Sequence, residues 1–164
     1  AGAEESHVTV AGNLFALLRN HLRGGPCRAY ISDMKLRVAK ADAYFYPDVF
    51  VTCDAADLAE PKAKSQARVV IEVLSKSTEA FDRGDKFALY RQLDSLQTYV
   101  LIDPRRPSID VFRRQGEDWL LRSVPEGGRL ELDTINFSCS LNQVYEDVIF
   151  EEPDPLGDPS KDHR

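Results

Sequence analysis

A short apolar segment that contains a single acid constrains the fold of this chain more than any other feature. Residues 68–74 read RVVIEVL, and residues 98–102 read TYVLI. Neither segment shows the polar and apolar alternation of a half-exposed strand, and both have the pattern of a strand covered on both faces. Strands of that kind need a layer of helices or sheet on each side. The two segments therefore predict an α/β (α+β) protein built on a central sheet.

The segments around these strands predict the covering layers. Apolar side chains at helical spacing over residues 7–22, ended by Gly24, Gly25 and Pro26, predict a first helix. Strands are expected at 28–38, 44–53, 109–113 and 119–123, the last two forming a hairpin, with helices at about 78–93 and 141–148 and a loop at 54–67. This order predicts a mixed central β-sheet flanked by helices, with a C-terminal β-hairpin.

The length of the chain and its C-terminal composition predict one domain with a tail. A chain of 164 residues is about the size of one domain, and we assign residues 1–150 to it. Residues 151–164 contain three prolines and five acidic residues, a composition that buries too little apolar surface to fold. They are expected to form a disordered, acidic, Pro-rich tail.

Charge is unevenly spread along the chain. The net charge is −6, which excludes a protein coated in positive charge, such as a histone-like protein. Residues 62–114 nevertheless carry a net charge of +4, whereas residues 115–164 carry −8. The basic middle is either a local anion-binding face or a set of solvated helix and turn faces.

The three cysteines, Cys27, Cys53 and Cys139, are far apart and form no CxxC pair. This spacing excludes a dense disulfide framework and a cysteine-rich zinc site, and it fits a reducing compartment. We expect all three to be small core residues. No apolar run approaches the roughly 18 residues that span a bilayer, so we expect a cytoplasmic protein with no membrane partner.

Two acidic residues interrupt predicted strands. Asp48 lies in YFYPDVFV and Glu72 in VVIEVL. Strand alternation puts Glu72 on the same face as Val70 and Leu74. A lone buried carboxylate is costly unless a cation, a proton or a strong donor compensates its charge. Each acid therefore ends a strand or pairs with an arginine such as Arg68, or the two acids belong to one functional site.

A lysine on the following helix is the candidate partner of these acids. Lys86 shares a helical face with Leu89, Tyr90 and Leu93, a face that should pack on the sheet. Its ammonium then either points inward, toward the carboxylates, or snorkels to solvent. Asp82 precedes Lys86 by four residues and could cap the helix or pair with the lysine; we favour the cap.

The combination of Asp, Glu and Lys suits metal-assisted hydrolysis of phosphodiesters. Two carboxylates at one end of a sheet can hold Mg²⁺ through oxygen ligands. Such an ion can polarise a phosphate oxygen and lower the pKa of a bound water. A neighbouring ammonium would orient that water and offset the negative charge that develops on the phosphate.

Three motifs together resemble those of a known family. PDV at 47–49, EVLSKST at 72–78 and DRGDKFALYR at 82–91 are similar to the motifs of the Uma-two family of endonucleases, in the PD-(D/E)XK restriction-endonuclease-like superfamily. The likeness extends from about residue 7 to residue 114. It implies a restriction-endonuclease-like core, DNA as the partner, and Mg²⁺ or Mn²⁺ as the cofactor.

The resemblance also implies roles for individual residues. Asp48 and Glu72 would bind the metal, and the backbone carbonyl of Val73 would be a further ligand. The usual superfamily motif has its lysine two residues after the acid, where this chain has Leu74. The basic residue of the family lies on the following helix, which matches Lys86. The expected catalytic residues are therefore Asp48, Glu72 and Lys86.

Two further expectations come from the family pattern. His7 falls where the family often has a histidine that could support the site, although a helix cap or a surface position is the interpretation that we favour. Cleavage of both strands of a duplex needs two active sites, so a homodimer is expected by analogy with the superfamily. The hairpin around residues 115–117 and the late strands are the candidate interface.

The leading hypothesis is a magnesium-dependent endonuclease that hydrolyses DNA phosphodiester bonds by in-line attack of water. One alternative is a nucleic-acid-binding module that keeps the fold without turnover. Another is a protein-interaction scaffold whose carboxylates merely pair with arginines.

Overall fold

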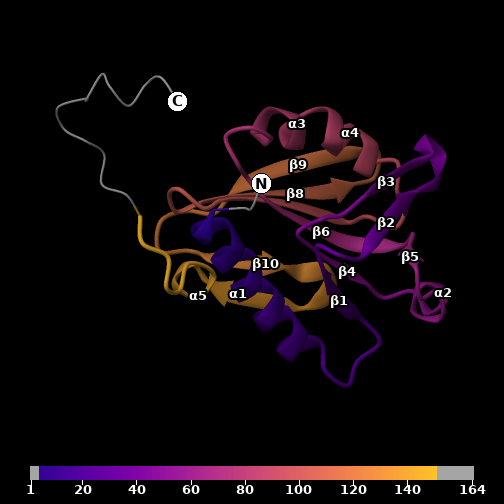
Figure 1. Cartoon of the computed structure of the whole chain (residues 1–164), viewed down its shortest axis with the longest axis horizontal. Helices are drawn as coiled ribbons and strands as arrows, with labels where there is room; N and C mark the ends of the chain where they lie inside the picture. Colours follow the sequence, from indigo (N-terminus) through magenta and orange to yellow (C-terminus); the bar gives the residue numbers. More distant parts are fainter. Residues whose placement is uncertain (1–3, 151–164) are drawn as a thin grey trace.

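A six-stranded mixed sheet lies at the centre of the computed structural model, which describes residues 4–150 (Figure 1). Its strands, in spatial order, are β1 (Arg28–Ile31), β4 (Val49–Thr52), β6 (Ala67–Val73), β7 (Thr98–Asp103), β8 (Ser108–Gln115) and β9 (Asp118–Ser123). In this sheet β6 and β7 are parallel, and all other neighbours are antiparallel. The predicted mixed sheet and its C-terminal hairpin, β8 and β9, are confirmed.

One face of the sheet packs against the first helix. α1 (Glu5–Leu22) contributes Val10, Leu14 and Leu18 to a core that it shares with the strands. A second hairpin, β10 (Arg129–Leu132) and β11 (Phe137–Ser140), and the short helix α5 (Leu141–Val144) complete this core.

The other face is covered by two short helices and a small sheet. α3 (Glu79–Arg83) and α4 (Asp85–Tyr90) lie over the β8–β9 side of the sheet in Figure 1. The small sheet has the order β3-β2-β5 and consists of β2 (Lys35–Val38), β3 (Ala43–Phe45) and β5 (Ala63–Lys64). Leu36, Phe87 and Tyr90 from these elements form a second core. Helices therefore flank the sheet on both faces, as expected.

The alternation predicted for β6 is present in the structure. Val69 and Val73 face the core under α1, whereas Val70 and Leu74 face the core under α4. Because Glu72 is two residues from both Val70 and Leu74 along the strand, its side chain lies on the same face, which α4 covers.

Two predicted strands are each divided in the structure. Residues 28–38 form β1 and β2, because a turn in which the Met34 N–H donates to the Ile31 carbonyl (2.9 Å) takes the chain from the central sheet to the small one. The next predicted strand is split into β3 and β4 around Pro47, whose nitrogen has no hydrogen to donate to a ladder. Asp48 consequently precedes β4 instead of lying inside a strand.

Other predicted boundaries also need correction. The expected loop at 54–67 contains α2 (Ala55–Ala59), which Asp54 caps, and β5. The expected helix at 78–93 is two helices interrupted at Gly84, and the last helix ends at Val144. The β10–β11 hairpin was absent from the prediction, since four-residue strands offer too few alternating positions to be distinguished from a loop.

Two of the three cysteines are joined in a disulfide. Cys27 and Cys53 are bonded with a Cα–Cα distance of 4.0 Å, whereas Cys139 is free and buried. The register of β1 and β4 explains this, since Arg28 is opposite Thr52 and the two cysteines are the next pair along. All three cysteines were expected to be small core residues; Cys27 and Cys139 lie in the core and Cys53 packs against it, but the disulfide was not predicted. Cysteine usage therefore no longer supports a reducing compartment.

No helix among residues 4–150 is both long and apolar enough to cross a membrane. The predicted acidic tail at 151–164 lies outside the described residues.

Candidate active site

The two candidate carboxylates meet at one end of the central sheet. β4 and β6 are antiparallel, with Val49 opposite Ile71, so the residue before β4 lies beside the end of β6. Asp48 has that position, and its Oδ2 accepts a hydrogen bond of 2.8 Å from the Val73 backbone N–H. Glu72 is the next-to-last residue of β6. The register thus brings together two acids that are far apart in the sequence.

Lys86 reaches Glu72 from α4. Its Nζ lies 2.6 Å from Glu72 Oε2, and the two side chains are 14% and 5% exposed. The rings of Phe45 and Tyr90 have their centroids 5.9 and 5.8 Å from the same nitrogen, within the range of cation–π attraction. The ammonium therefore points inward, and the snorkelling alternative is wrong.

Asp82 belongs to this cluster, and the cap that we favoured from the sequence is wrong. It lies inside α3, which begins earlier, at Glu79. Its Oδ1 is 3.5 Å from Lys86 Nζ, and its Oδ2 accepts a hydrogen bond of 3.1 Å from Thr78 Oγ1. Its backbone carbonyl accepts a further bond of 2.8 Å from the Tyr99 hydroxyl. The spacing of four residues was the signal for the Asp82–Lys86 pair.

His7 also reaches the cluster, so the favoured cap or surface position is wrong. Its Nε2, in the first turn of α1, lies 3.0 Å from the Val73 carbonyl oxygen and 3.5 Å from Asp48 Oδ2. Because a carbonyl oxygen only accepts hydrogen bonds, Nε2 carries the proton. No local pattern signals this contact, since it joins residues 66 positions apart.

Burial is the main influence on the two most enclosed carboxyl groups. It raises the pKa of Glu72 to about 7; the charges of Asp48 and Asp82 add to the effect, and Lys86 opposes it. Burial likewise raises the pKa of Asp82, against the influence of Lys86 and the hydrogen bond from Thr78. Neighbouring buried carboxyl groups with raised pKa values are typical of functional sites.

The two basic residues are stabilised in their charged forms. Burial lowers the pKa of Lys86, but the charges of Glu72 and Asp82 more than compensate and leave it above 10.5. The hydrogen bond to Asp48 raises the pKa of His7 above 6.5, although burial opposes it. At neutral pH Lys86 is therefore a positive hydrogen-bond donor and not a general base.

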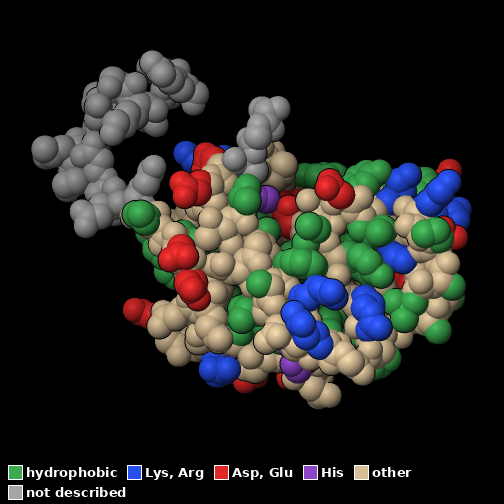
Figure 2. All heavy atoms as spheres, turned by 60° about the horizontal axis from the view of Figure 1, so that its bottom comes forward, with side chains coloured by type: hydrophobic (Ala, Val, Ile, Leu, Met, Phe, Trp, Pro, Cys, Tyr) green, Lys and Arg blue, Asp and Glu red, His purple; other side chains and the backbone are tan. Residues whose placement is uncertain are grey.

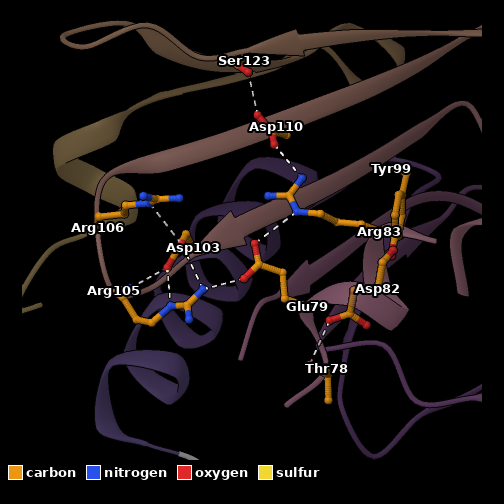
Figure 3. A network of polar contacts seen from close by, with 10 residues as sticks. All are labelled: Thr78, Glu79, Asp82, Arg83, Tyr99, Asp103, Arg105, Arg106, Asp110 and Ser123. Atoms are coloured by element: carbon orange, nitrogen blue, oxygen red, sulfur yellow. Dashed lines mark hydrogen bonds and ion pairs between the residues drawn. The ribbon is translucent and has the colours of Figure 1, made fainter. Parts of the chain in front are cut away.

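A network of ion pairs holds α3 in place beside the cluster (Figure 3). Glu79 accepts hydrogen bonds from Arg83 (3.2 Å) and Arg105 (2.9 Å). Arg105 also donates to Asp103 at the end of β7 (3.0 Å), and Arg83 donates to Asp110 on β8 (2.8 Å). These contacts fix the helix against two strands of the central sheet.

A group of arginines lies apart from this cluster. Figure 2 shows basic side chains both on the lower part of the face that it displays and at its upper right, and several acidic ones along the left edge. Arg19, Arg23 and Arg28 line a surface pocket of about 280 Å³ at the C-terminal end of α1. Because α1 has 18 residues, this end is about 27 Å from the end that carries His7. The arginines therefore do not belong to the candidate active site.

The oxygen donors of the cluster fit a hard divalent cation. Asp48, Glu72 and the backbone carbonyl of Val73 offer carboxylate and carbonyl oxygens, the ligands that Mg²⁺ prefers. Glu72 Oε2 faces Lys86, whereas its Oε1 has a long contact of 3.5 Å from the Tyr90 hydroxyl. Within the described part of the chain, no three His, Cys, Asp or Glu side chains form a metal-binding group. Backbone and water oxygens would therefore have to complete the coordination.

Asp48, Glu72 and Lys86 lie together at one end of the mixed sheet. Residues 1–142 match the model of the Uma2 family, described as "Putative restriction endonuclease". The chain belongs to this family, and the resemblance of its motifs to Uma-two proteins is confirmed.

Relatives of similar length support this assignment. An uncharacterized protein of Synechocystis, slr1290, is 37% identical over 150 residues, which cover 91% of this chain and 79% of the relative. A second Synechocystis protein, sll1609, is 34% identical over 127 residues, covering 76% and 72%. The crystal structure of "a putative nuclease belonging to DUF820" from Anabaena variabilis has a TM-score of 0.73 at 12% identity, over 91% of this chain and 85% of that one. This last likeness confirms the predicted fold.

Proposed function

We propose that this protein is a metal-dependent endonuclease that hydrolyses phosphodiester bonds of DNA. The observation that carries the proposal is the 2.6 Å contact of Lys86 Nζ with Glu72 Oε2. Glu72 lies on β6, and the neighbouring strand β4 begins directly after Asp48. One ammonium and two carboxylates in a small site provide a positive donor together with metal-binding oxygens. Membership of a restriction-endonuclease-like family supports the same class of reaction.

Asp48, Glu72 and the Val73 carbonyl would hold the metal ion, Mg²⁺ or Mn²⁺. When bound, the ion would polarise a phosphate oxygen and lower the pKa of a water. The contribution of the chain is to keep the oxygen ligands in position. The Val73 N–H holds the Asp48 carboxylate, and Nε2 of His7 holds the Val73 carbonyl.

Lys86 would orient the attacking water and offset the negative charge that develops on the phosphate. Its raised pKa keeps it protonated at neutral pH, so it acts through its charge and its N–H bonds. Leu74, two residues after Glu72, is 1% exposed and part of the core. We infer that Lys86, on α4, supplies the positive charge that the usual superfamily motif takes from a lysine at the position of Leu74.

Nicking of supercoiled plasmid tests the proposal. We expect the wild-type protein to produce open-circular DNA in Mg²⁺ or Mn²⁺ and none in EDTA. Glu72→Gln and Lys86→Met should each lower the rate by a factor on the order of 100 or more, the usual cost of removing a group that stabilises transition-state charge. Glu126→Gln and Lys62→Met, at exposed positions outside the site, are matched controls that should nick at the wild-type rate.

Thermal unfolding followed by circular dichroism will show whether each variant is folded at the assay temperature. If folded Glu72→Gln protein nicks DNA as fast as the wild type, the assignment of the active site is wrong. Nicking that persists in EDTA would contradict the role of the metal.

A second candidate function is nucleic-acid binding without turnover on the same fold. It is favoured by the ion pair itself, because Lys86 already neutralises the carboxylate of Glu72. Affinity for a DNA duplex that falls steeply with salt, with no cleavage in either metal, would support this function. Calorimetry that detects no divalent-ion binding and no DNA binding would support a protein-interaction scaffold instead.

A further inference from the structure

The last strand of the central sheet has an open edge. β9 pairs with β8 on one side, and no strand among residues 4–150 pairs with its other side. Leu120 and Leu121, in the middle of β9, are each 51% exposed. Soluble proteins usually protect such an edge, because its free N–H and C=O groups accept another strand. An exposed edge with two consecutive leucines is therefore a candidate interaction surface.

The register of the hairpin identifies the backbone groups that are free. Gln115 and Asp118 are paired across the two-residue turn, and the Val124 N–H donates to the Ile109 carbonyl at 2.9 Å. Since strand residues alternate in the direction of their backbone groups, the even-numbered positions of β9 face β8. The N–H and C=O groups of positions 119, 121 and 123 therefore face outward.

The sequence of β9, DWLLRS, is complementary to itself in the antiparallel direction. With the two-fold axis at Leu120, Asp118 of each copy lies opposite Arg122 of the other. Both of these residues are exposed. The same register places Trp119 opposite Leu121, two positions whose backbone groups face outward and can exchange hydrogen bonds. The pairing of opposite charges and the outward direction of the backbone groups therefore both favour the register centred on Leu120.

We propose that two copies of this chain associate through β9, antiparallel and centred on Leu120, so that their central sheets become continuous. Leu120 would contact Leu120 of the second copy on one face of the joined sheet. On the other face Leu121 would contact Trp119, whose ring is held by Phe87 at 5.3 Å and by Arg114 at 4.6 Å. Placing the axis at Leu121 instead would put Asp118 opposite an apolar residue and lose both charge pairs.

Sedimentation velocity of the purified chain measures this association. We expect a dimer over a concentration range of roughly 1–100 µM, the range in which strand-edge contacts of moderate affinity are populated. Leu121→Pro removes an outward N–H and leaves the ladder with β8 intact, so it should weaken dimerisation by at least about tenfold. Leu121→Val keeps the N–H and the β-propensity and should remain dimeric. A wild type that is monomeric throughout, or a dimer unchanged by Leu121→Pro, would overturn the proposal.

A charge exchange tests the register separately. Asp118→Arg and Arg122→Asp should each weaken the dimer, because each sets like charges opposite one another. An equimolar mixture of the two variants should form a heterodimer more tightly than either variant forms a homodimer, since both charge pairs are then restored. A mixture that associates no better than the single variants would overturn the proposed register. Neither result depends on nuclease activity, so the interface and the proposed function are tested independently.

Discussion

Glu72 is a carboxylate in a buried position, and its charge depends on the residues around it. Burial raises its pKa to about 7, and the ammonium of Lys86 opposes a further rise. Removal of one member of a buried ion pair is usually much more damaging than its net contribution suggests, because the other charge remains buried. The two residues are therefore coupled in stability as well as in the proposed chemistry.

Lys86→Met should give a loss of stability that grows as pH rises. A carboxyl group whose pKa is higher in the folded than in the unfolded protein takes up protons on folding, so it destabilises the fold increasingly between its unfolded and folded pKa values. For Glu72 these are 4.5 and about 7, and without Lys86 the upper value increases. We expect a loss of about 3 kcal/mol at pH 8 and much less at pH 5, measured by urea unfolding in EDTA.

Lys62→Met is the matched control, since Lys62 is exposed; it should change stability little at either pH. An equal loss at pH 5 and pH 8 in Lys86→Met would show that Lys86 stabilises the fold by packing and not through the charge of Glu72.

Part of the candidate site could be predicted residue by residue from the sequence. Glu72 stands out because a charge interrupts an apolar strand, and Lys86 because it shares a face with apolar neighbours. His7 was assigned elsewhere, since its contact with Val73 depends on how α1 packs on the sheet. Asp82 was assigned to a cap because a helix as short as α3, which begins at Glu79, shows no apolar periodicity that would place Asp82 inside it.

At the scale of elements, α3 is attached by charge more than by apolar packing. It has five residues, too few to be stable alone. Glu79 and Arg83 connect it to Arg105, Asp103 and Asp110 on the neighbouring strands and turn (Figure 3). Changes in this network should therefore alter the stability of the helix that carries Asp82.

Asp103→Asn should destabilise the protein at neutral pH and much less in acid. Burial alone would raise the pKa of Asp103, but hydrogen bonds from the Arg105 side chain and backbone hold it below 3.8. A depressed pKa contributes stability that is complete above 3.8 and is lost as pH falls through the folded value. We expect a loss of roughly 1–2 kcal/mol at pH 7 that shrinks below pH 3, measured by chemical unfolding. Asp133→Asn, at an exposed ion pair, is the control; a loss independent of pH would contradict the argument.

The elements that were predicted well are those whose own residues show a helix or strand pattern without reference to the rest of the fold. α1, β6, β7 and the β8–β9 hairpin have clear apolar periods and stop signals. The division of residues 28–38 between two sheets was not predicted, because β-branched and aromatic residues favour a strand without saying which sheet it joins. The same limit applies to the β10–β11 hairpin, whose short strands are stabilised by the core under α1.

At the scale of the whole molecule, the Cys27–Cys53 disulfide connects the first strand of the sheet to the strand that follows Asp48. It closes a segment with a sequence separation of 26 residues, which includes the small-sheet strands β2 and β3. Reduction should lower the free energy of unfolding by about 3 kcal/mol, as expected for constraining a loop of this size in the unfolded chain.

Urea unfolding with and without a reducing agent measures this difference. The Cys27→Ser/Cys53→Ser double variant should match the reduced protein and no longer respond to the reducing agent. Thiol titration in denaturant without reduction should find one free thiol, from Cys139. Three free thiols in protein refolded under oxidising conditions would contradict the disulfide.

The contacts of Val73 have a consequence for how this protein can be studied and how it can change. Its N–H binds Asp48 and its carbonyl binds His7, so the residue at the centre of the site takes part through its main chain alone. Mutational scanning, which alters only side chains, would report the packing of Val73 in the core and not its hydrogen bonds, whereas an ester in place of the amide between Glu72 and Val73 would remove the bond to Asp48. The side chain at position 73 therefore has to fill the core under α1, whereas its main chain has to keep β6 in the register that serves the site.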